Sequence, residues 1–183
     1  KRLCNQTFPT FTGSGSGQEG LGWLMEKTME ENIIEVQMAQ MRIAEAPAIL
    51  VTRGLGSCLG ITFYDPVKKL GAMVHPMLPD IEKAKVQTNP SRFVNSSIHN
   101  VLHEFERRGS LKPQIEVKMF GGARMFSFIT SESLLNIGQK NSEMAIATFE
   151  KLGMKIIGQE VDGTFGRTIE MNFLPDVYVP CET

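Results

Sequence analysis

The chain has 183 residues, of which 42% are hydrophobic and 21% charged, and its net charge is −1. This length suits one domain with a substantial core, and the balanced charge argues against nucleic-acid binding, because no global basic field would attract phosphates. No apolar run approaches the length of a membrane span, no secretory leader opens the chain, and three scattered cysteines suit a reducing compartment. We therefore expect a cytoplasmic protein that is not embedded in a membrane.

Residues 1–28 differ in character from the rest of the chain. The run from Gly13 to Gly17 alternates glycine and serine, which is typical of a flexible linker. We interpret residues 1–28 as a disordered or truncated segment, or one introduced by cloning, and residues 29–183 as the folded domain. Alternatively, the large apolar residues of this segment dock as a short peptide; they are Phe8, Phe11, Leu21, Trp23 and Leu24.

Two strands are predicted before the first glycine-rich turn. Apolar and polar residues alternate from Ile33, and the alternation changes phase at Ala39-Gln40, as at a bulge or a short break. After Pro47, residues 48–52 are predicted as a second strand that leads into the turn. A phosphate-binding loop is disfavoured there, because GLGSCLG lacks the P-loop lysine and no helix follows it.

Two apolar runs on either side of Asp65-Pro66-Val67-Lys68 predict a β-hairpin. Asp is favoured at the first position of a type I turn and Pro at the second. If Pro66 and Val67 are the central residues, Cys58 lies directly opposite His75, with Cβ atoms about 4.5–5.5 Å apart. Pro-Val is not a favoured two-residue loop, so a bulge could shift the pairing by one or two residues.

This register predicts two different faces for the hairpin. One face forms a core of Leu59, Ile61, Phe63, Leu70, Ala72 and Val74. The other face is a mixed and partly uncluttered surface of Cys58, Gly60, Thr62, Tyr64, Lys69, Gly71, Met73 and His75.

The pairing of a cysteine with a histidine is the arrangement that a Cys-His hydrolase needs. The imidazole takes the thiol proton, and the resulting thiolate is the nucleophile. Gly54, Gly56 and Gly60 would leave room for a substrate backbone and let N–H groups face a developing oxyanion. Thr52 ends the preceding strand, and its hydroxyl or carbonyl could hold the histidine ring in one orientation.

A helix is predicted after Thr88, with Asn89 as its cap, Pro90 at its first position and Gly109 just past its end. Its buried stripe is predicted to be Val94, Ile98, Val101, Leu102 and Phe105. His99 and His103 lie four residues apart, as in a zinc-binding HExxH motif. Position 100 is Asn rather than Glu, so we interpret both as partly exposed helix histidines.

The remaining elements complete an α+β pattern. Residues 114–120 predict a strand that ends at Gly121-Gly122, where either the backbone passes close to the active-site mouth or the strand makes a tight exit. Residues 139–152 predict a helix, and residues 155–161 and 168–173 predict strands around Asp162-Gly163. We expect Arg167 at the surface, with pairing to a carboxylate or a place in the site as alternatives, and an inert Cys181.

Several of these segments together resemble one known family. They are TRGLGSC at 52–58, Asp65-Pro66, GAM at 71–73, His75, MLPD at 77–80, FGGARMF at 120–126, NIGQKN at 136–141 and GTFGR at 163–167. In this order they resemble the CheD family, the chemoreceptor glutamine deamidases of bacterial and archaeal chemotaxis. One departure is Asp162 beside Gly163, where the family usually has paired glycines.

The resemblance implies a single α+β domain of two packed β layers flanked by helices. It also implies an amidohydrolase without a cofactor or metal, in which Cys58 attacks a glutamine carboxamide, His75 transfers protons and Thr52 orients His75. Backbone N–H groups near Gly56 and Ser57 would hold the oxyanion, with Gly121 and Gly122 as further candidates for contacting the oxyanion or substrate.

The expected substrates are methyl-accepting chemotaxis receptors, whose helical surfaces require an open, shallow site, and the expected partner is the phosphatase CheC. Two alternatives stay open: a non-catalytic CheC-binding module and a cysteine protease.

Overall fold

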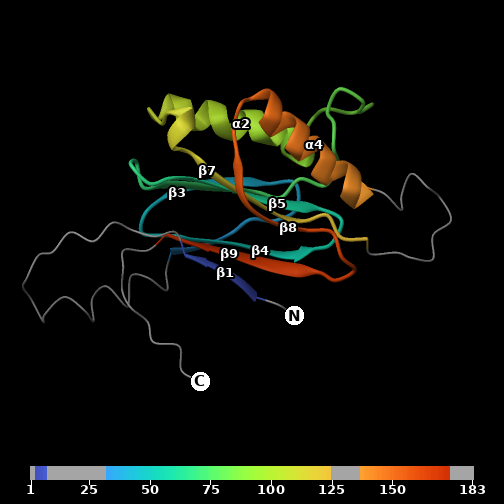
Figure 1. Cartoon of the computed structure of the whole chain (residues 1–183), viewed down its shortest axis with the longest axis horizontal. Coiled ribbons are helices and arrows are strands. Elements are labelled where there is room, and N and C mark those ends of the chain that lie inside the picture. The colour runs from blue at the N-terminus through green and yellow to red at the C-terminus, as the bar shows by residue number, and fades with distance from the viewer. Residues whose placement is uncertain (1–2, 8–31, 125–136, 174–183) are drawn as a thin grey trace, which may run out of the picture.

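The computed structural model describes residues 3–7, 32–124 and 137–173. Two β-sheets pack face to face, and helices α2 (Val94–Arg107) and α4 (Ile137–Lys151) cover the outer face of one of them (Figure 1). The predicted α+β class, with two β layers and helices in one domain, is therefore confirmed.

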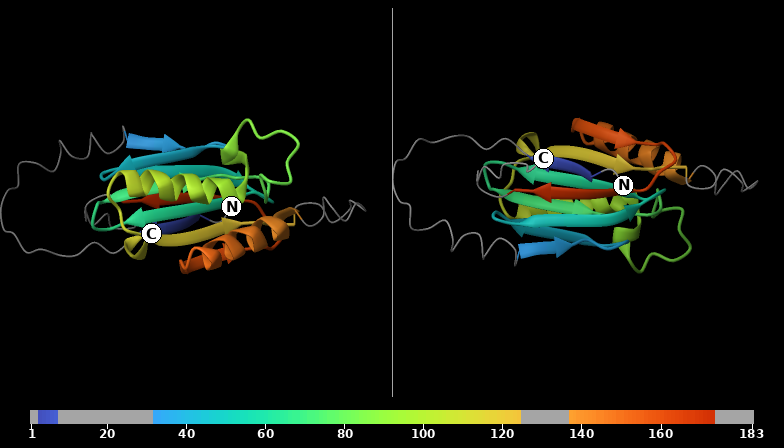
Figure 2. Two further views of the ribbon diagram at one scale, coloured as in Figure 1. Left: turned by 90° about the horizontal axis from the view of Figure 1, so that it is seen from above. Right: turned by 90° about the horizontal axis from the view of Figure 1, so that it is seen from below.

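The sheet farther from the helices has four strands, in the order β1, β9, β4, β2 (Figure 2). These strands are β1 (Leu3–Thr7), β9 (Arg167–Asn172), β4 (Ile49–Leu55) and β2 (Ile33–Glu35). Strand β1 runs parallel to β9. Its five residues lie within the segment predicted to be disordered, whereas residues 8–28 of that segment lie outside the described residues.

The other sheet has five strands, in the order β3, β6, β5, β7, β8. These strands are β3 (Met41–Glu45), β6 (Leu70–Val74), β5 (Leu59–Asp65), β7 (Glu116–Gly121) and β8 (Ile156–Val161). Strands β2 and β3 belong to different sheets, so the predicted phase change is a true break, at which Ala39 has a φ of 60°. The Asp162-Gly163 turn likewise carries the chain from one sheet to the other.

Each face of the five-stranded sheet has its own core. The core beneath the helices contains the whole predicted hairpin core face together with Val94, Ile98, Val101, Leu102 and Phe105 of α2. The core between the sheets includes Leu50, Leu55, Cys58, Met73 and Ile169.

The predicted start of the first long helix is four residues early. Asn89 does accept a hydrogen bond from the Ser91 amide at 3.1 Å, but it caps the short 3-10 helix η2 (Pro90–Arg92). Phe93 then takes an extended conformation, so α2 begins at Val94. Gly109 has a φ of 80°, as predicted for a residue just past a helix end.

The predicted hairpin register is wrong by two residues. Tyr64 pairs with Gly71 rather than Lys69, and the pair Asp65–Leu70 closes a four-residue loop. The longer loop forms because an Asp65 carboxylate oxygen accepts hydrogen bonds from the amides of Val67 (2.9 Å) and Lys68 (3.0 Å). A shift of two residues leaves every side chain on its predicted face, since strand side chains alternate with a period of two.

The hairpin face predicted to be an open surface is instead buried by the four-stranded sheet. A Cβ atom on Gly60 would lie 2.5 Å from Ile169 Cδ1, and one on Gly71 would lie 3.0 Å from side-chain atoms of Met171 and Phe173. Gly60 therefore makes room for the second sheet rather than for a substrate backbone.

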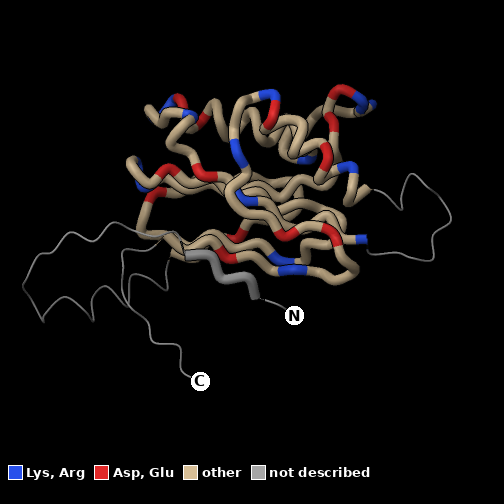
Figure 3. The backbone as a smooth tube through the Cα atoms, in the orientation of Figure 1, with Lys and Arg blue, Asp and Glu red and all other residues tan. Residues whose placement is uncertain are grey.

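Charged residues of both signs are interspersed over the helices and loops (Figure 3). Among the described residues, no helix is long and apolar enough to cross a lipid bilayer.

Candidate active site

Thr52 and His75 meet across the two sheets. Thr52 lies in β4 and is fully buried, and His75 follows β6 and is 2% exposed. The Thr52 hydroxyl donates a hydrogen bond to the Val36 carbonyl at 2.6 Å, and its oxygen lies 2.8 Å from His75 Nδ1. Of the two groups that the sequence offered, hydroxyl and carbonyl, it is thus the hydroxyl that contacts the ring.

These contacts determine which nitrogen of His75 carries the proton. A hydroxyl has one proton, and a carbonyl can only accept, so the Thr52 proton goes to Val36. His75 Nδ1 must then donate to the Thr52 oxygen, which leaves Nε2 as the nitrogen with the free lone pair. His75 Nε2 is buried and has no hydrogen-bond partner among the described residues.

Burial keeps this imidazole neutral. Desolvation lowers the pKa of His75 from its ordinary value of 6.5, and the contact with the Val36 backbone opposes that shift only in part. A neutral ring with its proton on Nδ1 can act as a base through Nε2.

Cys58 lies beside this base on the neighbouring segment. The Leu59 amide donates to the Pro76 carbonyl at 3.0 Å, and this bond extends the observed hairpin register beyond the ends of the strands. In that register Cys58 stands opposite Met77 and is diagonal to His75, instead of directly opposite as predicted. Diagonal neighbours on one face lie roughly 7–8 Å apart, within reach of a long side chain. In this structure no hydrogen bond joins Cys58 Sγ to His75 Nε2.

The nucleophile candidate is nearly buried, whereas an open, shallow site was expected. Cys58 is 8% exposed and belongs to the core between the sheets. Burial raises the pKa of the Cys58 thiol above 9.0, and a hydrogen bond with its own backbone lowers it in part. The resting pair is therefore a thiol and a neutral imidazole, rather than a thiolate and an imidazolium.

The glycines predicted near the site lie close to Cys58. A Cβ atom on Gly121 would lie 2.3 Å from the Cys58 carbonyl oxygen, so only glycine allows this approach. The Gly122 amide donates to that same carbonyl at 2.9 Å, so it is not available to bind an oxyanion. Among the described residues, the amides of Gly56, Ser57 and Cys58 donate to no other backbone carbonyl, which leaves them as candidate oxyanion donors.

One residue to which the sequence assigned no role connects the two halves of the site. Asn141 of α4 is fully buried, and its Nδ2 donates to the Ser57 carbonyl at 2.9 Å and to the Met77 carbonyl at 3.1 Å. The signal in the sequence was a polar residue on the same helix face as Ala145 and Phe149.

The structure also places the other residues that the sequence singled out. His99 and His103 are exposed on α2, and no group of metal-binding side chains is present among the residues that the structure describes. Arg167 is buried rather than at the surface; it pairs with Glu160 at 3.3 Å and stacks over Phe165. Asp162 has a φ of 66°, a left-handed conformation that glycine adopts without strain.

Comparison with known proteins agrees with the resemblance seen in the motifs. A family model described as CheD chemotactic sensory transduction matches residues 77–175, a range that begins after Cys58 and His75. The probable chemoreceptor glutamine deamidase CheD of Desulforamulus reducens is 40% identical over 136 residues, which cover 74% of this chain and 82% of that protein. The chemoreceptor glutamine deamidase CheD of Halalkalibacterium halodurans is 37% identical over 142 residues, which cover 77% of this chain and 88% of that protein.

Among solved structures, YlmD from Geobacillus stearothermophilus is similar to 67% of this chain and 50% of its own, with 13% identity and a TM-score of 0.40. The assignment depends on the sequence relatives, whose similarity spans most of both chains. The chain belongs to the CheD family.

Proposed function

We propose that this protein is a glutamine deamidase of methyl-accepting chemotaxis receptors, with Cys58 as nucleophile and His75 as base. The observation that carries the proposal is the Val36–Thr52–His75 chain of hydrogen bonds, which leaves Nε2 as a free base on the segment beside Cys58. The names of the relatives, chemoreceptor glutamine deamidases, support the choice of substrate.

The first half of the reaction forms a thioester. His75 Nε2 takes the thiol proton while Cys58 Sγ attacks the side-chain amide carbon of a glutamine. The negative charge that develops on the amide oxygen is stabilised by backbone N–H groups of residues 56–58. The intermediate then collapses, and the His75 imidazolium gives its proton to the departing ammonia.

The second half restores the enzyme. His75 Nε2 removes a proton from water, the hydroxide attacks the thioester carbon, and the C–S bond breaks to release glutamate. The Cys58 thiolate takes back a proton from His75. Because the imidazole is neutral at rest, both halves begin with the base in its active form.

The burial of Cys58 favours a side-chain amide over a backbone amide as the target. A nucleophile that is 8% exposed can be reached by one extended glutamine side chain. A protease must instead accommodate main chain on both sides of the bond that it cuts.

We also propose CheC as a binding partner, on the family resemblance alone, and this role does not require the Cys58, His75 and Thr52 arrangement.

The proposal is tested by incubating the protein with the cytoplasmic part of a chemoreceptor and analysing its peptides by mass spectrometry. Deamidation adds about 1 Da to particular glutamines, and Cys58→Ala abolishes it because the thioester cannot form. The matched controls are Cys4→Ser and Cys181→Ser, which remove the other two cysteines and should retain the activity. Cleaved receptor peptides would support the protease instead, and unmodified peptides together with CheC binding would support the module.

A further inference from the structure

Asn141 joins the cysteine loop to the histidine segment beyond the end of the hairpin ladder, where the Leu59 amide donates to the Pro76 carbonyl at 3.0 Å. Past that bond the two segments are anchored to different parts of the fold. The cysteine loop is held by the strand end at Gly121–Ala123, since the Gly122 amide donates to Cys58 O and the Ala123 amide donates to Gly56 O. Both bonds have ordinary lengths, 2.9 and 2.8 Å. This anchor holds the cysteine loop against the end of β7.

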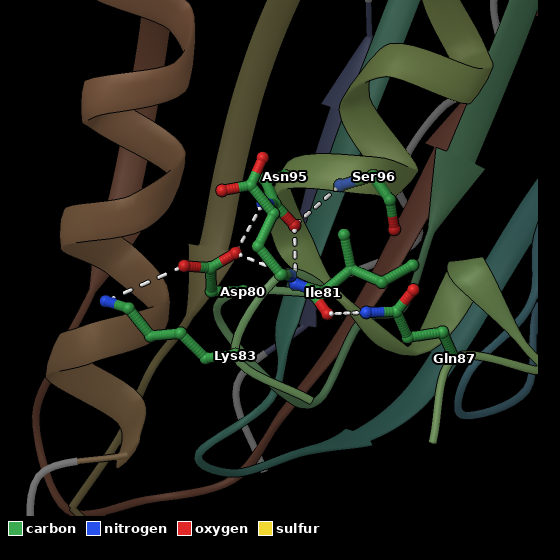
Figure 4. A network of polar contacts seen from close by, with 7 residues as sticks. Asp80, Ile81, Lys83, Gln87, Asn95 and Ser96 are labelled. Atoms are coloured by element: carbon green, nitrogen blue, oxygen red, sulfur yellow. Dashed lines mark hydrogen bonds and ion pairs between the residues drawn. The ribbon is translucent and has the colours of Figure 1, made fainter. Parts of the chain in front are cut away.

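The histidine segment is held on its far side by the start of α2. The amides of Met77 and Leu78 donate to the Arg92 carbonyl, both at 2.9 Å, and the Val94 amide donates to Leu78 O at 2.8 Å. Farther along, Asp80 accepts a hydrogen bond from Asn95 at 2.8 Å within the polar network of Figure 4. This anchor fixes the imidazole relative to α2.

The Asn141 carboxamide bridges the two anchored segments. Its Nδ2 group donates to the carbonyls of both Ser57 and Met77. Ser57 directly precedes Cys58, and Met77 lies two residues after His75. The carboxamide's orientation is unambiguous, because the opposite rotamer would point an oxygen at two carbonyl oxygens. Its Oδ1 is buried and has no partner among the described residues, so the amide is retained at a cost to folding.

The start of α4 is built to bring this side chain to the loop. A Cβ atom on Gly138 would lie 2.4 Å from the Gly122 carbonyl oxygen, so the first turn of the helix packs directly on the strand end that anchors Cys58. Asn141 follows Gly138 by three residues and therefore lies on the same side of the helix.

We propose that Asn141 is a positioning residue that sets the separation between the Cys58 thiol and His75 Nε2. This inference rests on the proposed function only in assigning those two groups their roles. Thiol and imidazole are diagonal neighbours, so a small change in how the segments lie changes whether the proton can pass between them.

The test compares Asn141→Leu, which keeps the size but has no donor, with Thr148→Val as a matched control. Thr148 is a buried polar residue of the same helix, and its hydroxyl bonds back to Met144 O at 2.7 Å rather than to either segment. Asn141→Leu should lower kcat for receptor deamidation by about 10- to 100-fold and change KM by less than about twofold. Thr148→Val should leave both constants near wild type.

A second readout does not depend on deamidation. Alkylation of Cys58 by iodoacetamide is followed on the tryptic peptide 54–68, and the rate at about pH 7 is divided by the rate at about pH 9.5. Simple loosening of the loop exposes the thiol, which lowers its raised pKa toward the ordinary value and therefore raises the ratio. Loss of positioning lowers the ratio toward that of His75→Ala, and Asn141→Ser should shift it in the same direction.

The outcomes separate the two proposals. A lower ratio in Asn141→Leu, with a wild-type enzyme that deamidates no receptor, would support the positioning role and refute the proposed substrate. A ratio and kcat equal to those of Thr148→Val would overturn the positioning role, as would a His75→Ala ratio equal to that of the wild type.

Discussion

Replacing Thr52 by Val tests whether the hydroxyl fixes the working form of His75. The substitution preserves shape but removes the hydroxyl that donates to the Val36 carbonyl and accepts from the Nδ1–H of His75. Because both sites are buried, with Thr52 at 0% and His75 at 2% exposure, the free energy of unfolding should fall by about 1–3 kcal/mol.

The effect on catalysis should be larger than this loss of stability explains. Without the hydroxyl acceptor at Nδ1, the neutral ring can carry its proton on Nε2, and in that form it cannot take the thiol proton. We expect kcat for receptor deamidation to fall by about 10- to 100-fold, which is part of the 10²- to 10⁴-fold that a general base supplies.

The matched variant is Thr52→Ser, which keeps the hydroxyl and loses one buried methyl group. It should lose about 1 kcal/mol of stability and retain kcat within a few fold. Urea unfolding gives the stabilities, and peptide mass spectrometry gives the rates. Wild-type kcat in Thr52→Val, or equal damage from Ser and Val, would refute the argument that the hydroxyl sets the tautomer.

Three further predictions concern pH and backbone geometry. Burial lowers the pKa of His75 in the folded state, so the unfolded chain takes up a proton first as the pH falls. The free energy of unfolding should therefore be highest above about pH 6.5 and decline below it. Urea titrations of His75→Gln should show a smaller decline over the same pH range. Asp162→Gly removes the strain of a side chain at a φ of 66° and should raise the free energy of unfolding by up to about 1 kcal/mol. A variant less stable than the wild type would contradict this strain. Gly138→Ala forces a Cβ to within 2.4 Å of Gly122 O and should cost about 1–3 kcal/mol by thermal unfolding, whereas no loss would show that α4 can move away freely.

Local patterns predicted the elements of this fold well because each depends on nearby residues. The stripe of α2 and the two faces of the hairpin follow from periodicity, and both are found in the structure. The register was wrong because it depended on the loop length, which the Asp65 carboxylate sets by bonding two amides. The faces were nevertheless correct, since a shift of two residues preserves them.

What covers each face could not be predicted, because the covering strands come from distant parts of the chain. Gly60 was interpreted as space for a substrate, but the side chain that fills this space is Ile169, more than a hundred residues later. The same long-range packing buries Cys58 and brings Asn141 to the loop. Local sequence reasoning can suggest the reactive side chains, but it cannot show how much of each stays exposed.

The most direct measurement of the central claim is interception of the thioester. Hydroxylamine added during receptor deamidation attacks a thioester carbon and releases the thiol, so it converts the target glutamine to a glutamyl hydroxamate that mass spectrometry distinguishes from glutamate. Wild-type protein should yield hydroxamate and glutamate at the same receptor positions, and Cys58→Ala should yield neither. Glutamate formation without any hydroxamate, or glutamate formation that persists in Cys58→Ala, would contradict the account.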